Sequence, residues 1–222
     1  MAKNSQAEIL SERRRIMVEI QLRRRGIGDE RVLEAMARVP RHEFVASEYW
    51  DQAYEDHPIP IGEGQTISQP YIIAVSLAAA ALRPSDVVLE VGTGSGYQTA
   101  VLAELAAQVY SIERLAWLAS AAESKLARLG YTNVQVVIGD GSLGLPQRSP
   151  FDAIIVSAAA PELPPALFVQ LREGGRMVIP IGPAAVQQLQ LVENEKGTPR
   201  VITLDACRFV PLIGDQGYCF DQ

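Results

Sequence analysis

The chain has 222 residues, of which 48% are hydrophobic and 21% are charged, so it suits one α/β domain and not a disordered chain. A formal net charge of −6 argues against nucleic acid as the main partner, since nucleic-acid binding normally needs a basic face. No apolar run reaches the length of a membrane span, and no secretory signal is visible. The two cysteines and two histidines show neither metal-ligand spacing nor a disulfide framework. We therefore expect a cytoplasmic protein with no metal and no membrane partner.

The first third of the chain predicts two helices followed by a long loop. A helical pattern covers about 7–25, and a second helix covers 29–38 before Pro40. The stretch 41–69 has no sustained period, and ordered loops of that length are usually functional. A helix over about 70–82 follows. The expected buried stripe of the first helix consists of Ile9, Leu10, Met17, Ile20 and Leu22.

Two short basic runs, Arg13–Arg15 and Arg23–Arg25, lie within the first predicted helix. Their separation leaves them within roughly 80° of each other around the helix axis, so a partly basic face is one interpretation. The alternative, which we favour, is a solvated helix face with acidic neighbours. Those neighbours are Glu8, Glu12 and Glu19.

Beyond Pro84 the chain alternates between strands and helices. Strands are expected at 87–91, 108–112, 134–138, 151–156 and 176–181, and helices at 97–107, 115–129 and 165–171. This order implies an α/β fold with a mostly parallel central sheet, helices on both faces, and ligands outside the carboxyl ends of the strands. The tail differs, because three further strands are expected without helices between them, as an antiparallel extension. These are 187–192, 200–204 and 207–212.

A glycine turn follows the first strand of this alternating region. The apolar segment Val87–Val91 runs into Gly92, Gly94 and Gly96, where missing side chains let a ligand lie against the backbone. The spacing is G-x-G-x-G and not the G-x-G-x-x-G of dinucleotide sites, and Glu90 stands two positions before the first glycine. A pyrophosphate disfavours such a carboxylate, whereas a cationic ligand tolerates it. An ordinary tight turn with chance glycines is the alternative.

This acid-x-G-x-G-x-G segment resembles the first motif of the S-adenosylmethionine-dependent methyltransferases. The resemblance implies a Rossmann-like class I methyltransferase fold with S-adenosyl-L-methionine as cofactor and S-adenosyl-L-homocysteine as product. The cofactor-binding residues implied in this segment are Glu90, Gly92, Gly94, Ser95 and Gly96.

The ends of the next two strands offer the other groups that such a cofactor needs. Glu113 ends the second strand, where a carboxylate can accept both ribose hydroxyls; a surface pair with Arg114 is the alternative. Asp140 ends the third strand, where it can take an adenine amino group while Gly141 admits a backbone donor. An Asp-Gly turn with no ligand is the alternative there. We expect Glu113, Arg114, Asp140 and Gly141 to belong to the cofactor site.

The loop before the glycine turn narrows the resemblance to one family. The run Gly64–Pro70 (Gly-Gln-Thr-Ile-Ser-Gln-Pro) looks like the signature segment of protein-L-isoaspartate (D-aspartate) O-methyltransferases. Other blocks resemble the same family in order and spacing over about residues 30–215. They are Leu89–Thr99, Ser111–Arg114, Gly139–Gly141, Pro150–Val156, Gly174–Gly175 and Phe209–Leu212.

The family resemblance implies methyl transfer to the free carboxylate of L-isoaspartyl residues, with D-aspartyl residues as a further substrate, in damaged proteins. By match, Ser68 is the active-site serine, and Thr66 and Ile67 join the cofactor surface. Gln65, Thr66, Ser68, Pro211 and Leu212 would contact the peptide. A carboxylate is already nucleophilic at pH 7, so placement close to the methyl carbon matters more than a general base. We expect a monomer with one domain over 1–222: helices and substrate loop 1–69, cofactor-binding core 70–182, and C-terminal strands 183–222.

Several alternatives stay open from the sequence. Ser68 precedes Pro70, where an N-cap serine sits, and Thr66 could serve in its place. His42 and His57 are interpreted as structural. The segment Ser157–Ala160 departs mildly from the family pattern but keeps a hydroxyl. The competing functions are methylation of another carboxylate, a nucleotide-binding oxidoreductase, and a non-catalytic module that senses adenosylmethionine.

Overall fold

The computed structural model describes residues 5–183 and 185–219. Its N-terminal helical segment changes its winding along its length. Helix α1 (Gln6–Ile16) begins at a capping box between Ser5 and Glu8. A π-helical stretch (Met17–Leu22) and a 3-10 turn (Arg23–Arg25) follow without a break.

The change of winding decides which side chains of this segment are buried. In a π-helix residue i+5 lies over residue i, so Leu22 joins Met17 on the inner face. The predicted burial of Leu10, Met17 and Leu22 is confirmed, whereas the predicted burial of Ile9 and Ile20 is wrong. These two side chains are 42% and 43% exposed. Ile9 lies about 100° around the axis from Leu10, and the π turn moves Ile20 off the inner face.

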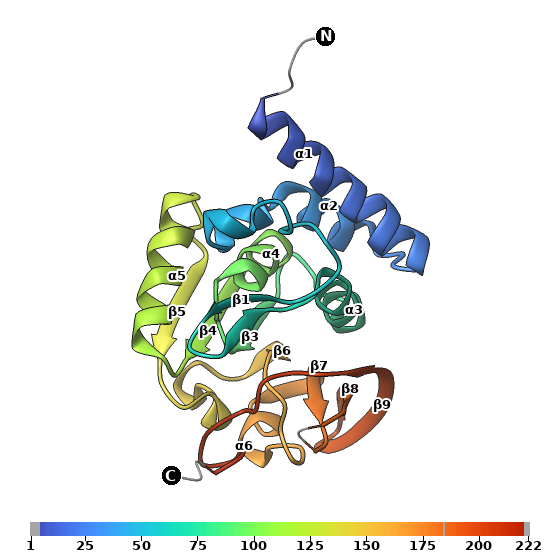
Figure 1. Ribbon diagram of the computed structural model, residues 1–222. Helices are drawn as coiled ribbons and strands as arrows, with labels where there is room; N and C mark the ends of the chain where they lie inside the picture. The colour runs from blue at the N-terminus through green and yellow to red at the C-terminus, as the bar shows by residue number, and fades with distance from the viewer. Residues whose placement is uncertain (1–4, 184, 220–222) are drawn as a thin grey trace.

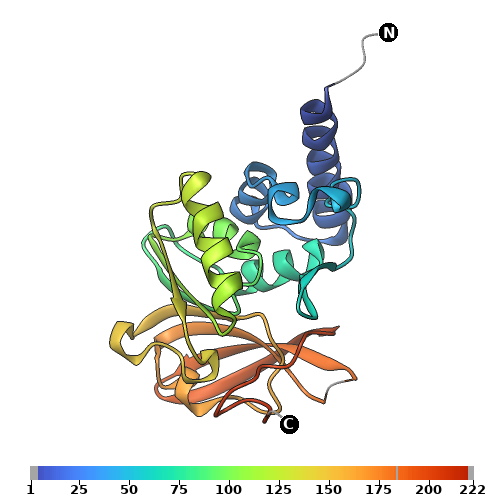
Figure 2. The same cartoon turned by 60° about the vertical axis from the view of Figure 1, so that its left-hand side comes forward.

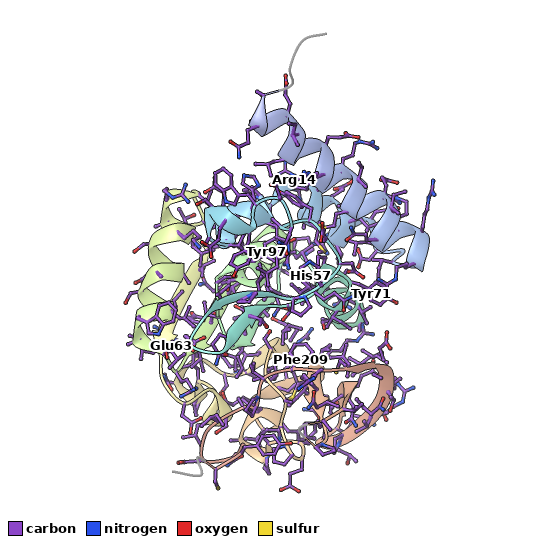
Figure 3. All side chains as sticks on the ribbon, in the orientation of Figure 1. Arg14, His57, Glu63, Tyr71, Tyr97 and Phe209 are labelled. Carbon is purple, nitrogen blue, oxygen red and sulfur yellow. The ribbon has the colours of Figure 1, made fainter. Side chains whose placement is uncertain are left out.

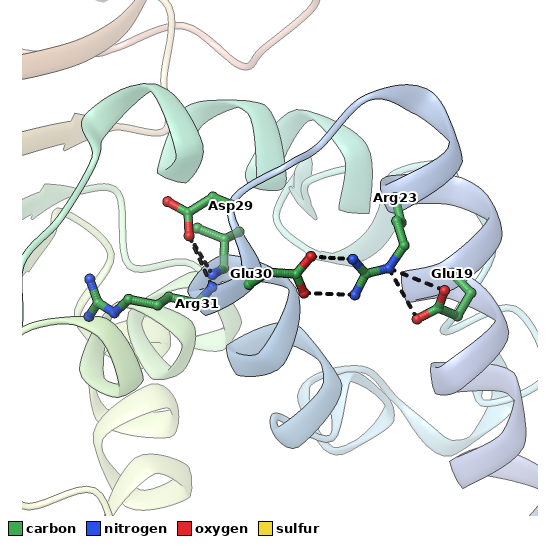
Figure 4. Close-up of polar contacts among 6 residues, drawn as sticks. Glu19, Arg23, Asp29, Glu30 and Arg31 are labelled. Atoms are coloured by element: carbon green, nitrogen blue, oxygen red, sulfur yellow. Dashed lines mark hydrogen bonds and ion pairs between the residues drawn. The ribbon is translucent and has the colours of Figure 1, made fainter.

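Four of the six arginines in the two basic runs form ion pairs with other described residues. Arg23 bridges Glu19 and Glu30, joining the N-terminal segment to the next helix, as Figure 4 shows. The other pairs are Arg13 with Asp51, Arg15 with Glu12, and Arg25 with Asp56. Of the three acidic neighbours expected from the sequence, Glu12 and Glu19 pair with these arginines, whereas Glu8 bonds Ser5. The other partners come from later in the chain.

Helix α2 (Glu30–Arg38) begins at Asp29, whose carboxylate accepts hydrogen bonds from the backbone N–H groups of Arg31 and Val32 (Figure 4). Two 3-10 turns follow, at Arg41–Phe44 and Ser47–Tyr49. The predicted long loop then closes as a hairpin of β1 (Ile59–Gly62) and β2 (Gln65–Ile67), and leads into α3 (Pro70–Ala80).

One seven-stranded sheet organises the rest of the chain, in the order β5-β4-β3-β6-β7-β8-β9. The pairs among the first five of these strands are parallel, and β7-β8-β9 are antiparallel, so the predicted antiparallel extension is confirmed. The strands are β3 (Val87–Val91), β4 (Gln108–Glu113), β5 (Val134–Ile138), β6 (Phe151–Val156), β7 (Leu171–Ile181), β8 (Gln187–Glu195) and β9 (Thr198–Cys207). The helices between them are α4 (Tyr97–Leu105), α5 (Ala116–Arg128) and α6 (Pro165–Phe168).

Helices cover both faces of this sheet, unequally. Val88 and Val109 face a core shared with the N-terminal segment and α2 to α4, whereas Leu89 and Ile112 face a smaller core shared with α6. Figures 1 and 2 show the long helices together above the sheet and α6 with the C-terminal segment below it. No helix in the described part of the chain is both long and apolar enough to cross a bilayer.

Two predicted elements differ from the structure. The helix expected at 165–171 is a single turn, because β7 already begins at Leu171 and takes up Gly174–Gly175 at an irregular stretch of its pairing with β6. The strand expected at 207–212 is also wrong. β9 runs through to Cys207, and the chain then leaves the sheet toward Pro211, which lacks a backbone donor. There Leu212 donates its N–H to the carbonyl of Ala159, at 2.7 Å.

Candidate active site

A cleft opens at the carboxyl ends of β3, β4 and β6, where the topology of a parallel sheet places ligands. The space inside it is about 780 Å³ when the open mouth is included. Three segments meet around it: the glycine turn 92–95, the loop 65–68 and the C-terminal segment 210–213. Residues far apart in the chain therefore enclose one space.

The glycine turn forms the floor of the cleft because its backbone adopts conformations that favour glycine. Gly92 and Gly94 have φ values of +94° and +53°, and both line the cleft together with Ser95. Gly96, also at positive φ, begins α4 and does not line the cleft. A Cβ there would lie 3.2 Å from the Cβ of Ala122, so Gly96 lets α5 pack closely.

Glu90 lies beneath the glycine turn and not among the residues that line the cleft. Its carboxylate accepts hydrogen bonds from the hydroxyls of Thr99 and Ser111 and, at 3.0 Å, from Nε2 of Gln98. Burial raises its pKa to about 7, against the opposing effect of these three donors. Glu90 therefore joins the start of α4 to β4 through these hydrogen bonds.

Glu113 reaches the cleft from the end of β4, with only 7% of its surface exposed. Its two carboxylate oxygens accept the N–H groups of Gly94 and Leu115, at 2.9 and 3.0 Å. A carboxylate has about four acceptor sites, so roughly two remain for the vicinal hydroxyls of a ribose. Arg114 lines the cleft beside it.

Two neighbouring residues in the turn after β5, Asp140 and Gly141, have different roles. Gly141 lines the cleft, and a Cβ there would fall 2.5 Å from Cγ1 of Val91, so only glycine fits. Asp140 does not line the cleft. Its carboxylate accepts from the N–H and hydroxyl of Ser142 and from the N–H of Asp215, which ties the C-terminal segment down. Burial alone would raise the pKa of Asp140, but these hydrogen bonds outweigh it and lower the pKa.

The start of α3, next to Ser68, is capped by Asp56, a residue outside that helix. The N-cap position of α3 is Gln69, whose side chain makes no capping bond, so the interpretation of Ser68 as the N-cap is wrong. Asp56 supplies the missing acceptor, taking the N–H of Tyr71 at 3.2 Å and Nε2 of Gln69 at 2.7 Å. The Ser68 hydroxyl is consequently not committed to the helix.

A buried arginine fixes the backbone of this loop from below. The Arg41 guanidinium, 0% exposed, donates to the carbonyls of Ser68 and Ala53, each at 2.8 Å. It lies 4.9 Å from the ring centre of Tyr97, labelled in Figure 3. Burial lowers the pKa of Arg41 to about 10. The sequence carries no signal for this role, since Arg41 stands in an aperiodic stretch.

A second hollow adjoins the cleft, and the two share Thr66, Ser68, Ser157, Val210 and Pro211. It runs from the start of α3 past the residues that follow β9, where Figure 3 shows Phe209 between the C-terminal strands and the layer of long helices. Ser157 accepts a hydrogen bond from Nε2 of Gln98 at 2.8 Å, the same group that reaches Glu90. We call this second hollow the acceptor groove.

Most of the residues proposed from the sequence meet around the cleft. Those that line it are Gln65, Thr66, Ile67, Ser68, Gly92, Gly94, Ser95, Glu113, Arg114, Gly141, Pro211 and Leu212. Those that do not are Glu90, Gly96 and Asp140. The sequence reasoning missed Gln98 and Ser157, although the acid-x-G-x-G-x-G motif placed Gln98 on the first turn of α4. Neither histidine lines the cleft or the groove; His42 bonds the hydroxyl of Tyr54 instead.

A parallel sheet with a glycine turn after β3, a carboxylate at the end of β4 and a loop closing over both defines a Rossmann-like class I methyltransferase. The family model for protein-L-isoaspartate(D-aspartate) O-methyltransferase matches residues 12–217. The chain belongs to this family.

Curated relatives and solved structures agree with that assignment. A protein-L-isoaspartate O-methyltransferase of Koribacter versatilis is 60% identical over 91% of either chain, and one of Methanoculleus marisnigri is 55% identical over 91% of this chain and 92% of that one. A solved protein-L-isoaspartate O-methyltransferase superposes with a TM-score of 0.83 at 32% identity, covering 92% of this chain and 67% of the other. A Plasmodium falciparum structure, described as a putative member in complex with S-adenosyl-L-homocysteine, gives 0.79 at 29% identity, covering 90% and 98%.

Proposed function

We propose that this protein transfers a methyl group from S-adenosyl-L-methionine to the free carboxylate of L-isoaspartyl residues in damaged proteins, which starts their repair. The observation that carries the proposal is the junction at Thr66 and Ser68. These residues line both the cleft suited to the cofactor and the groove suited to a peptide. The names of the relatives, and the S-adenosyl-L-homocysteine in one of the solved structures, support it.

The residues of the cleft fit this cofactor. Gly92, Gly94 and Ser95 offer bare backbone for the methionine part, and Glu113 has acceptor sites left for the ribose hydroxyls. Gly141 lines the same cleft at a position where a Cβ would overlap Val91. The bound cofactor supplies an electrophilic methyl group on a sulfonium. Glu90 and Asp140 act indirectly: Glu90 holds the first turn of α4, and Asp140 holds the C-terminal segment.

The acceptor needs placement and not a base. A carboxylate is an anion at neutral pH, so no proton moves when its oxygen bonds to the methyl carbon and the carbon–sulfur bond breaks. We assign to the Ser68 hydroxyl a hydrogen bond to one carboxylate oxygen, which leaves the other free to attack. Gln65, Thr66, Pro211 and Leu212 hold the peptide and, with Ile67, exclude water from the junction. The products are a methyl ester and S-adenosyl-L-homocysteine.

The test is incubation with radiolabelled S-adenosyl-L-methionine and two peptides that differ only in an aspartyl or isoaspartyl linkage. Label should enter the isoaspartyl peptide alone, as a base-labile ester. Equal labelling of both peptides, or none, would overturn the proposal. A third peptide with D-aspartate tests whether that residue is a substrate as well.

We further propose that the chain works as a monomer in the cytoplasm, with one domain over 1–222 and no nucleic-acid partner. The continuous sheet supports one domain, because β7 joins the parallel core to the antiparallel C-terminal strands. In this division 1–69 supplies the helices and substrate loop, 70–182 the cofactor core, and 183–222 the C-terminal part. The acid-paired arginine runs support the absence of a nucleic-acid face.

A further inference from the structure

The acceptor groove is almost uncharged. Its cavity volume is about 950 Å³, far more than one isoaspartyl residue needs. Of the described residues that line it, Arg208 alone carries a formal charge. This contrasts with the net charge of −6 over the chain. A peptide in the groove therefore meets one cation and no competing carboxylate from the lining.

The other long polar side chains of the groove are already engaged within the protein. Gln187 accepts the N–H of Phe209 and donates to the carbonyl of Pro183, each at 2.8 Å. Gln69 donates to Asp56, and the Tyr218 hydroxyl donates to the carbonyl of Gly182. These groups hold the walls together and have little left for a peptide.

Arg208 differs from them, because its side chain has no partner among the described residues. Its side chain is exposed, and within the described part of the chain no hydrogen bond or ion pair engages it. The acid nearest in sequence, Asp205, does not line the groove, and its carboxylate accepts the N–H of Ala206 at 2.8 Å. The guanidinium is thus available to an anion that enters the groove.

The separation of Arg208 from Pro211 along the chain determines which residue of a bound peptide the guanidinium contacts. Arg208 precedes Pro211 by three residues, so their backbones are at most about 10 Å apart, and Pro211 lines both the groove and the cleft. An extended peptide rises roughly 3.3 Å per residue. A side chain about three residues from the isoaspartyl residue would therefore lie level with Arg208.

We propose that Arg208 is a specificity-determining residue that favours isoaspartyl sites with an acidic side chain within about three residues. This rests on the proposed function, because it assumes that the peptide occupies the groove. An Asp or Glu at that distance pairs with the guanidinium, whereas a Lys or Arg is repelled by it. The preference operates through KM and weakens at high salt.

The test compares two isoaspartyl peptides that are identical except for Glu or Lys at the second and third positions on each side. Ion pairs that are exposed or only partly desolvated change affinity modestly. The kcat/KM of the wild type should therefore be about 5- to 10-fold higher for the Glu peptide than for the Lys peptide. Arg208→Glu should reverse the order of the two peptides, and Arg208→Lys should keep it. Arg200→Glu is the matched control, because it makes the same charge change on β9 away from the groove.

The outcomes separate this inference from the proposed function. A wild type that methylates neither peptide, nor a neutral isoaspartyl peptide, contradicts the proposed function itself. A wild type that methylates all three without a charge preference contradicts the role of Arg208. A preference that Arg208→Glu leaves in place, or that Arg200→Glu alters equally, also contradicts it.

Discussion

Ser68 presents a hydroxyl to both the cleft and the acceptor groove while other residues hold its backbone. Arg41 fixes its carbonyl from below, and Asp56 takes over the capping of α3. The local sequence suggests a helix cap at this position, and only the three-dimensional position of Asp56 shows why no cap is needed. The serine hydroxyl thereby has no capping role, and we propose that it orients the acceptor carboxylate.

Replacing Ser68 by alanine tests this separation of roles. We expect Ser68→Ala to lower kcat by about 10- to 100-fold, because the acceptor carboxylate loses one orienting hydrogen bond. The melting temperature should stay within about 2 °C, since loss of a true N-cap costs about 1 kcal/mol and would lower it by roughly 2–4 °C. Initial rates and thermal melts measure the two effects.

Ser120→Ala is the matched control, because Ser120 is an exposed serine of α5 far from the loop in sequence. It should change neither quantity. A Ser68→Ala variant with a lower melting temperature and the kcat of the wild type would contradict this, and would show that the role of the serine is purely structural.

Glu90 predicts a pH dependence of stability. Its pKa is about 7 in the folded chain and about 4.3 when unfolded, so the folded state holds the extra proton between these values. The free energy of unfolding should therefore fall as pH rises, by about 4 kcal/mol in all from this group and by about 2.5 kcal/mol between pH 5 and pH 8. Urea unfolding of the wild type and Glu90→Gln at pH 5 and pH 8 measures it.

The variant removes the titration but keeps a side chain of nearly the same shape beside Thr99 and Ser111. Its stability relative to the wild type should accordingly rise between the two pH values. An unchanged difference between the two proteins at pH 5 and pH 8 would mean that Glu90 stays charged in the folded state.

At the scale of elements, the C-terminal segment after β9 forms one wall of the cleft without being a strand. It is attached by backbone bonds to Ala159 and by the Asp140 carboxylate, which accepts the N–H of Asp215. Gly214 lies against that carboxylate, with no room for a Cβ next to Asp140 and Ser142. The position of Pro211 and Leu212 depends on this close approach.

Gly214→Ala should therefore displace the wall while leaving the sheet intact. Overpacking of this kind costs about 1–3 kcal/mol, so we expect the KM values for cofactor and peptide to rise by about 10-fold. Steady-state kinetics with each substrate varied measure this. The control is Gly28→Ala, where a Cβ meets nothing within 4 Å. Equal kinetics for the two variants would show that the contact with Asp140 does not position the wall.

The sequence predicted regular elements better than it predicted this segment. The predicted bounds of strands β3 to β6 agree with the observed ones to within one residue. These strands are apolar runs bounded by glycine or polar turns, as at Val87–Val91. The segment 207–212 has the same apolar character, but it leaves the sheet to bond Ala159, which local pattern does not encode. The roles of Arg41 and Asp56 are equally hidden, because they depend on partners more than ten positions away.

For the whole molecule, one continuous sheet predicts one cooperative unfolding transition that the cofactor product shifts as a unit. S-adenosyl-L-homocysteine at 100 times its Kd should stabilise the fold by about 2.7 kcal/mol. For a chain of this length that corresponds to a rise in melting temperature of roughly 5–10 °C. Differential scanning calorimetry with and without the ligand measures it.

In Glu113→Gln the ligand should raise the melting temperature much less, since the variant removes a charged acceptor from the cleft. Glu123→Gln, on the exposed face of α5, is the control and should keep the full rise in melting temperature. Two separate transitions would contradict the single domain. A melting temperature that the ligand does not move would contradict the assignment of the cleft.

The cleft is closed by residues 65–68 from the first third of the chain and 210–213 near its end. A ribosome releases these parts in order, and at roughly 5–20 residues per second the second wall follows the first by many seconds. A growing chain with its glycine turn and Ser68 already folded therefore still lacks one side of its donor pocket. We therefore expect a fragment that stops before residue 210 to bind the donor poorly, because one wall of the cleft is missing.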